Sequence, residues 1–317
     1  MGSIELEEIC DKAQSIGIGG HVRPDGDCVG SSLALYLFLK KKYPRKHVEL
    51  FLEKPAEIFA CISGYDEINS AFPQREPFDV VFVIDCSVDR LGQAETYFRS
   101  AKHTVNIDHH ISNADGCGDD NMIDADASST AELIYGLIGK DYMDAEIAKA
   151  IYIGMIHDTG VFHYSCTSPK TLRIAADLIS YGFDFPKIID ETFYEKTYVQ
   201  NQILGRAVLE SFPFMGGKCI VGCVSRKTME FYGAEPKDLD GIVNQLRITK
   251  GVEVAIFLYE TETLTYKVSL RSCGIVDVAK IAAFFGGGGH VRASGCTMTG
   301  TFHDVVNNLS AEIAKQL

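Results

Sequence analysis

The stretch that decides the fold is HVRPDGD at residues 21–27, which stands between two apolar runs. The first run, residues 16–18, predicts a buried strand, and the second, residues 33–39, predicts a helix. In open α/β sheets, loops of this kind lie at the carboxyl ends of the strands, where binding sites gather. The loop supplies one imidazole and two carboxylates, from His21, Asp25 and Asp27. This donor set suits Mn, Fe, Co or Zn better than Ca or Mg alone, so we expect a metal site here.

The first half of the chain alternates expected strands and helices. Further strands are expected at residues 47–52, 78–84 and 103–107. Helices are expected from a capping box at residues 129–132 to about 138, over 144–157, and from an N-cap at 168 to a stop at Gly182. The fold class is therefore α/β, with a doubly wound parallel-sheet domain over residues 1–185.

The second half has a different rhythm. Residues 186–212 predict one long amphipathic connector helix, a helical linker between two domains. Residues 213–317 predict a smaller α/β domain with a mixed sheet. Its expected strands are residues 218–225, 252–259 and 264–272, with a hairpin loop at 260–263, and its expected helices are residues 239–247, 276–285 and 304–315.

Further acidic and histidine residues follow other predicted elements of the first domain. Asp85 comes directly after the strand at 78–84, Asp108-His109-His110 comes directly after the strand at 103–107, and Asp158 ends a helical run. Because the carboxyl ends of parallel strands meet at one edge of a sheet, we expect these side chains to converge with the first loop. Four other acids, Asp119, Asp120, Asp124 and Asp126, are expected in a solvated loop.

This many carboxylates suits a pair of divalent cations. Two such ions about 3.5–4 Å apart repel each other, and anionic ligands must offset that repulsion. We expect the first ion to bind His21, Asp25 and Asp85. We expect the second ion to bind Asp27, Asp85, His109 and Asp158. Asp85 would thus bridge both ions, and a hydroxide between them would be the nucleophile, since metal binding can lower the pKa of water to about 7.

Two neighbouring residues have expected roles in catalysis. His110 would face the phosphoryl group of the substrate, and Asp108 would anchor a ligand histidine. Asp85 belongs to the catalytic set as well, because it would hold both ions.

The second domain carries a glycine run with basic residues after it. Residues 286–289 are all glycine, so that backbone N–H groups can approach a phosphate closely, and we single out Gly287, Gly288 and Gly289. Charge-assisted donors and a hydroxyl accompany the run, from His290, Arg292, Arg271 and Ser272. These residues are the candidate substrate-binding set.

Together these motifs resemble the DHH phosphoesterase superfamily, which is named for the residues that stand here as Asp108-His109-His110. The second domain resembles the DHH-associated C-terminal domain, which implies that it binds the substrate. Residues 154–164 and 167–172 look most like the branch of nanoRNases and 3′-phosphoadenosine 5′-phosphate phosphatases. The resemblance covers essentially the whole chain and implies manganese-dependent hydrolysis of phosphoester or phosphoanhydride bonds.

Composition bounds the partners. The net charge of −13 argues against a long nucleic-acid duplex, whose binding needs a basic face. The sequence lacks an apolar run long enough for a membrane span, and residues 1–8 are acidic without a signal-peptide pattern. Ten cysteines without a repeated spacing predict reduced thiols in a cytoplasmic protein. Whether the chain is a monomer or a homodimer is left open.

The resulting hypothesis is a phosphoesterase for short oligoribonucleotides, for 3′-phosphoadenosine 5′-phosphate, or for both. A cleft between the domains would limit the substrate to a few residues. One alternative is a phosphodiesterase for cyclic or linear dinucleotides. A second alternative is a nucleotide sensor without catalysis. The presence of every expected ligand residue argues against this alternative. A pyrophosphatase is disfavoured, because Ser225-Arg226-Lys227 continues with Thr228 where those enzymes carry a second lysine.

Overall fold

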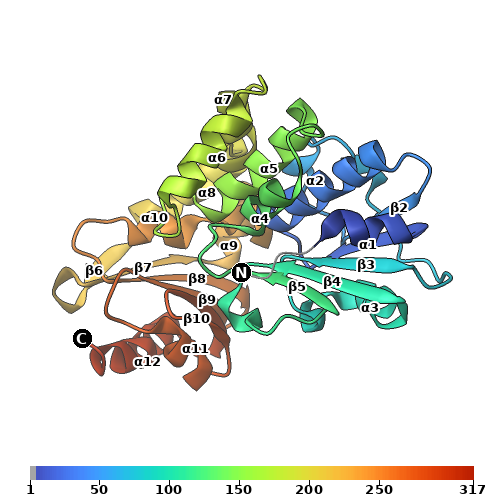
Figure 1. Ribbon diagram of the computed structural model, residues 1–317. Helices are drawn as coiled ribbons and strands as arrows, with labels where there is room; N and C mark the ends of the chain where they lie inside the picture. The colour runs from blue at the N-terminus through green and yellow to red at the C-terminus, as the bar shows by residue number, and fades with distance from the viewer. Residues whose placement is uncertain (1–4) are drawn as a thin grey trace. The chain divides into compact units, whose positions relative to one another are not determined.

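The structure is a computed structural model that describes residues 5–317, in two compact units divided between Glu195 and Lys196 (Figure 1). Residues 1–4, which belong to the segment expected to hold no signal peptide, lie outside the described residues. Within residues 5–317, no helix combines the length and the apolar character that crossing a bilayer requires.

The first unit contains a five-stranded parallel sheet in the order β2-β1-β3-β4-β5. Its strands are β1 (Ser15–Gly20), β2 (His47–Phe51), β3 (Val80–Ile84), β4 (His103–Asp108) and β5 (Asp120–Ile123). Its α-helices are α1 (Leu6–Lys12), α2 (Gly26–Lys42), α3 (Glu95–Ser100), α4 (Thr130–Leu137), α5 (Ala145–Asp158), α6 (Pro169–Ile179) and α7 (Phe185–Ile189). The strand order changes direction between β1 and β3, which is where ligands bind in sheets of this kind.

Strand β3 separates two hydrophobic cores, as a central strand should. Its five residues are all buried. Phe82 faces the larger core, which contains α2, α4 and α5, and Val83 faces a smaller core that includes Tyr97 of α3. Figure 1 shows α2, α4 and α5 on one face of the sheet and α3 on the other. Because the side chains of β3 pack alternately into the two cores, the strand is held in place and the residue after it, Asp85, lies at the carboxyl edge of the sheet.

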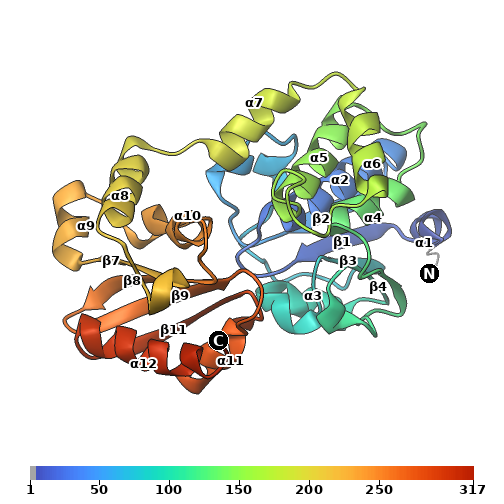
Figure 2. The same cartoon turned by 90° about the vertical axis from the view of Figure 1, so that its left-hand side faces the viewer.

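The second unit contains a mixed six-stranded sheet in the order β10-β11-β9-β8-β7-β6, in which only β7 and β8 run parallel. Its strands are β6 (Phe212–Phe214), β7 (Cys219–Val224), β8 (Val254–Glu262), β9 (Thr265–Ser272), β10 (Gly288–His290) and β11 (Ala293–Thr299). Its α-helices are α8 (Tyr198–Leu209), α9 (Arg226–Tyr232), α10 (Ile242–Arg247), α11 (Val278–Phe284) and α12 (Phe302–Ala314). Figure 2 shows α11 and α12 on one face and α8, α9 and α10 on the other, each over its own hydrophobic core. The two units thus confirm the expected fold class.

The connector is not the single long helix expected over residues 186–212. Helix α7 passes into a π-helical turn, Asp190–Tyr194, and Glu195 then adopts an extended conformation. A new helix, α8, starts after Thr197, whose hydroxyl accepts from the N–H of Gln200 while the Gln200 side chain accepts from Thr197 N. This capping box is a start signal inside the segment, and it divides the expected helix in two.

Two smaller expectations are also wrong. Strand β8 continues to Glu262, so residues 260–262, expected in the hairpin loop, lie in a strand, and the turn includes Leu264 at φ 60°. Asp120, expected in a solvated loop, lies in edge strand β5 and accepts a 2.7 Å hydrogen bond from His103 Nε2. In both places a cross-strand partner extends a strand that the local sequence does not mark.

The start of α4 shows how the first unit buries a charge. The hydroxyl of Ser129 accepts from the N–H of Glu132, as the expected capping box requires. The Glu132 carboxylate, however, is buried and accepts from Ser128 Oγ at 2.7 Å, Thr171 Oγ1 at 2.8 Å and Lys170 Nζ at 2.9 Å. Burial alone would raise the pKa of Glu132, but these donors, with Lys170 the strongest, lower it below its usual value.

We predict that Glu132→Ala lowers the free energy of unfolding by roughly 2–4 kcal/mol, because it leaves the buried hydroxyls of Ser128 and Thr171 without their acceptor. Urea unfolding followed by circular dichroism measures this. Since folding lowers the pKa, the wild-type advantage over Glu132→Gln should hold at neutral pH and decline as the pH falls through about 4.3. The control is Glu8→Ala, which removes an exposed ion pair with Lys12 and should cost at most about 1 kcal/mol. Equal losses in the two alanine variants would contradict the prediction.

Candidate metal centre

The predicted metal ligands converge at the carboxyl end of the parallel sheet. His21 follows β1, Asp85 follows β3, and His109 follows β4. The Nε2 atom of His21 lies 3.5 Å from Asp85 Oδ2 and 3.6 Å from Asp25 Oδ1. These three side chains therefore form one half of the site, around a nitrogen that points at two carboxylates.

The other half is centred on His109. Its Nε2 atom lies 2.9 Å from Asp158 Oδ2, 3.7 Å from Asp85 Oδ1 and 3.9 Å from Asp27 Oδ2. Asp158 is the last residue of α5, and Asp27 is the second residue of α2. Asp85 thus contributes one carboxylate oxygen to each half of the site.

Backbone carbonyls orient both imidazoles. His21 Nδ1 lies 2.9 Å from the carbonyl oxygen of Val22, and His109 Nδ1 lies 3.4 Å from that of Ala127. A carbonyl can only accept, so Nδ1 carries a proton in each ring and Nε2 is the nitrogen that faces the carboxylates. This is the arrangement that metal-binding histidines use.

Asp85 has a strained backbone. Its φ angle is +63°, in the left-handed region that is uncommon for residues other than glycine. Its N–H donates to the carbonyl of Ile107 at 2.9 Å, which holds the turn against β4. Strain of this kind persists where the surrounding structure fixes it, and it concentrates at functional sites.

The carboxylates are crowded and only partly neutralised by the protein. Burial and the charges of Asp85 and Asp158 raise the pKa of Asp27 well above its usual value. The Asp27 carboxylate accepts from the N–H groups of Thr130 at 2.7 Å and Ala131 at 2.9 Å, at the N-terminus of α4. These donors help to hold the charge, but the like charges beside it favour a cation.

The side chains present fit a divalent metal. Among residues 5–317, three groups place their ligand atoms within 4.8 Å of one another: His21, Cys28 and Asp85; Asp85, His109 and His110; and Asp27, His109 and Asp158. His21 Nε2 is buried and has no hydrogen-bond partner. Leaving a buried polar atom unpaired is costly, so this nitrogen is better explained as a ligand atom than as a packing feature. The mixed nitrogen and oxygen donors suit a transition-metal ion.

The pair expected to assist catalysis lies beside this cluster. His110 Nδ1 donates to Asp108 Oδ1 at 2.7 Å and lies 3.6 Å from Asp85 Oδ1, so Asp108 holds the ring of His110 and not, as expected, that of the ligand histidine His109. Asp108 is fully buried, which would raise its pKa, but its hydrogen bonds, first of all that from His110, lower it. The side chain of His110 is 31% exposed, so its ring can reach a molecule outside the protein.

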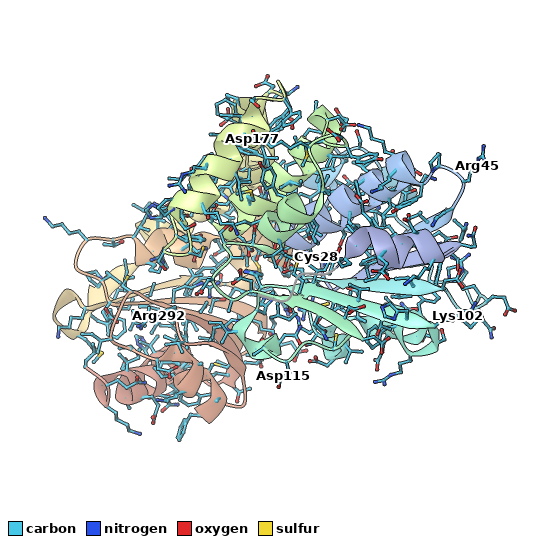
Figure 3. All side chains as sticks on the ribbon, in the orientation of Figure 1. Cys28, Arg45, Lys102, Asp115, Asp177 and Arg292 are labelled. Atoms are coloured by element: carbon cyan, nitrogen blue, oxygen red, sulfur yellow. The ribbon has the colours of Figure 1, made fainter. Side chains whose placement is uncertain are left out.

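The sequence did not indicate two residues of this site. Cys28, labelled in Figure 3, is fully buried at the start of α2 and completes one of the three groups. Thr130 Oγ1 donates to Asp85 Oδ1 at 2.9 Å. The position of Thr130 beside a capping serine marks a helix start, but its contact with Asp85 depends on tertiary packing.

The candidate substrate-binding residues lie at the β9, β10 and β11 end of the second sheet. Arg271 pairs with Ala293 in the register of β9 and β11, and Ser272 N donates to the carbonyl of Arg292 at 3.1 Å. Arg292, labelled in Figure 3, donates through Nη1 to Ser272 Oγ at 3.5 Å and to the Val276 carbonyl at 3.2 Å. The backbones of these three residues are therefore neighbours, although the Arg271 guanidinium group donates through Nε to Asn244 Oδ1 of α10 at 3.2 Å.

The glycine run lies partly in a strand. Gly288, Gly289 and His290 form β10, which pairs with β11. A Cβ atom at Gly287 would lie 2.2 Å from the carbonyl oxygen of Gly295, and one at Gly289 would lie 2.5 Å from that of Ala293. The close approach of two backbones therefore explains these two glycines without a ligand.

Comparisons with known proteins agree with this architecture. Residues 15–155 match the DHH family, N-terminal domain, and residues 216–317 match the DHHA1 domain. The chain is 32% identical over 291 residues to the bifunctional oligoribonuclease and PAP phosphatase NrnA of Thermus thermophilus, covering 90% of this chain and 84% of that protein. It is 28% identical to the protein of the same name from Bacillus subtilis, covering 88% and 87%. A crystal structure of an exopolyphosphatase-related protein from Bacteroides fragilis superposes with a TM-score of 0.89, at 27% identity, covering 98% of this chain and 94% of that one.

We predict that the metal-free protein binds Mn²⁺ and that Asp85→Asn weakens this binding by at least about 100-fold. The reason is that the Asp85 carboxylate contributes one oxygen to each half of the site. Isothermal titration calorimetry measures the affinity. The control is Asp79→Asn, which changes an aspartate at the opposite end of β3 that accepts from the N–H groups of Gln14 and Ser15. Equal affinities in Asp85→Asn and the wild type would rule out a shared role for Asp85.

Proposed function

The chain belongs to the DHH family, and from that premise we propose that it is a divalent-metal-dependent phosphoesterase. Its proposed substrates are short oligoribonucleotides, hydrolysed to mononucleotides, and 3′-phosphoadenosine 5′-phosphate, hydrolysed to AMP. The observation that carries the proposal is the convergence of His21, His109 and four aspartates on one sheet edge, with a buried His21 Nε2 that faces two carboxylates and has no hydrogen-bond partner. The names of the Thermus and Bacillus relatives support the substrate class.

We propose two Mn²⁺ ions as the cofactor. His21, Asp25 and Asp85 would hold the first ion. Asp27, Asp85, His109 and Asp158 would hold the second ion. When bound, such ions lower the pKa of water and neutralise charge on the attacked phosphate. Asp25 Oδ1, which lies beside His21 Nε2, also accepts from the N–H groups of Asp27 and Cys28, so these donors would hold the carboxylate in place for the metal.

The protein's own contribution near the metals is to orient the phosphoryl group. His110 is fixed through Nδ1 by Asp108, which leaves Nε2 directed away from that carboxylate. An exposed imidazole edge held in one orientation can donate to a phosphoryl oxygen and steady it as charge develops. Asp108 would act by keeping this ring in place.

The second unit would bind the nucleotide. Arg292 and Ser272, which are hydrogen-bonded to each other, would offer a guanidinium group and a hydroxyl to a phosphate, and Arg271, whose guanidinium group contacts Asn244, would add a further donor. His290 and the adjacent glycines, Gly287, Gly288 and Gly289, would add contacts from β10 and the turn before it. The net charge of −13 favours a short anionic substrate held by local donors over a long duplex. Free thiols at all ten cysteines fit the cytoplasm, where we propose that the enzyme works.

A substrate panel tests the function. Metal-free protein is incubated with and without Mn²⁺ and with 3′-phosphoadenosine 5′-phosphate, RNA dimers to pentamers, linear and cyclic diadenylate, and pyrophosphate. We expect Mn²⁺-dependent release of mononucleotide from the short RNAs and of inorganic phosphate from 3′-phosphoadenosine 5′-phosphate. Asp85→Ala should release neither product, because it removes the carboxylate common to both halves of the site. Nucleotide binding without any product would instead identify a sensor.

A second experiment tests the role of the second unit. We predict that Arg292→Ala raises KM by about 10-fold or more with little change in kcat, because a charge-assisted hydrogen bond to the bound nucleotide is lost. The control is Arg226→Ala, which removes an exposed arginine of α9 that pairs with Glu230. Steady-state kinetics with an RNA dimer measures both variants. A lower kcat at unchanged KM in Arg292→Ala would count against a binding role.

A further inference from the structure

A buried asparagine makes hydrogen bonds to the strained turn that carries Asp85. Asn106 is a fully buried residue of β4. Its Nδ2 group donates to the carbonyl of Val83 at 3.1 Å and to the carbonyl of Cys86 at 3.0 Å. These carbonyls lie on either side of Asp85, so one amide group fixes both flanks of the turn.

A second asparagine connects Asn106 to Asp108, the aspartate that holds the His110 ring. Asn113 is 7% exposed and ends a short 3-10 turn, Ile111–Asn113. Its Nδ2 group donates to Asn106 Oδ1 at 2.9 Å and to Asp108 Oδ2 at 2.8 Å. Asn106 Oδ1 also accepts from Cys117 N at 3.1 Å. The amide of Asn106 therefore has a partner for both hydrogens and two donors on its oxygen.

We propose that Asn106 and Asn113 form an amide relay, a chain of hydrogen bonds that fixes the position of Asp85 relative to His110. Both asparagines are therefore positioning residues of the reaction. The relay runs from the Asp85 turn through Asn106 and Asn113 to Asp108. Asp108 then holds His110 at 2.7 Å. The inference rests on the proposed function and assigns to it two residues that touch neither metal nor substrate.

The chemistry of the contacts explains why amides are used. Each end of the relay presents acceptors, backbone carbonyls at one end and a carboxylate at the other, so the connecting groups must donate. Asn106 must both donate through Nδ2 and accept through Oδ1, which neither a lysine nor an aspartate can do, whereas Asn113 donates both of its amide hydrogens. An amide does both without adding charge to a site that already holds several carboxylates. Because the acceptors are buried, losing a donor leaves them unpaired as well as free to move.

The test uses Asn113→Ala in the full-length protein, with kcat, KM and Mn²⁺ affinity measured. We expect kcat to fall by about 10- to 100-fold with KM within about twofold of the wild type, because the change loosens groups near the reacting phosphate and leaves the second unit intact. The control is Asn121→Ala. Asn121 also makes two side-chain hydrogen bonds in this unit, but both go to Gly118. It should lower stability without lowering kcat.

A milder variant keeps the proposal testable if Asn113→Ala does not fold. Asn113→Ser retains one hydroxyl donor and should give a kcat between those of the wild type and the alanine variant. If the wild type cleaves nothing in the substrate panel, the proposed function fails on its own. The relay is then tested by Mn²⁺ affinity, which Asn113→Ala should lower by about 10-fold and Asn121→Ala should not. A folded Asn113 variant with wild-type kcat and wild-type Mn²⁺ affinity would overturn the relay, as would an equal loss in Asn121→Ala.

Discussion

Mutual repulsion among buried carboxylates is the constraint around which the first unit is organised. Asp27, Asp85 and Asp108 are each almost completely buried at one sheet edge, and charges so placed are costly unless they are paired or hydrogen-bonded. The fold meets this cost with donors from distant segments. Asp27 receives the first N–H groups of α4, Asp85 receives the hydroxyl of Thr130, and Asp108 receives donors from His110 and Asn113.

The same constraint links the fold to its chemistry. The strand order brings the ends of β1, β3 and β4 together, and the left-handed backbone of Asp85 directs one carboxylate between two histidines. The protein donors satisfy some of the carboxylate oxygens, and His21 Nε2 is left without a hydrogen bond. A site with surplus negative charge and an imidazole nitrogen that makes no hydrogen bond can bind cations, and the hydrolytic function that we propose depends on such binding.

Much of this arrangement can be predicted from the sequence, because it depends on local pattern. Continuous apolar runs mark β1 and β3, and the polar residues that follow a parallel strand must emerge at the same edge, so the positions of His21 and Asp85 are predictable. The donors are not predictable in this way. Thr130 contacts Asp27 from 103 residues away, and Asn106 has the sequence pattern of an ordinary strand residue. The sequence also does not indicate structure that a partner strand decides, as in β10, where two glycines of the run lie against β11.

The separate hydrophobic cores of the two units have a consequence for heat denaturation. A chain whose parts bury their apolar side chains independently need not lose all its structure in one cooperative step. Calorimetry should then resolve two endotherms. Because the carboxylate cluster belongs to one part alone, Mn²⁺ should shift one endotherm upward and leave the other in place. The enthalpy of the endotherm that shifts would show how large a part of the chain unfolds together with the metal site.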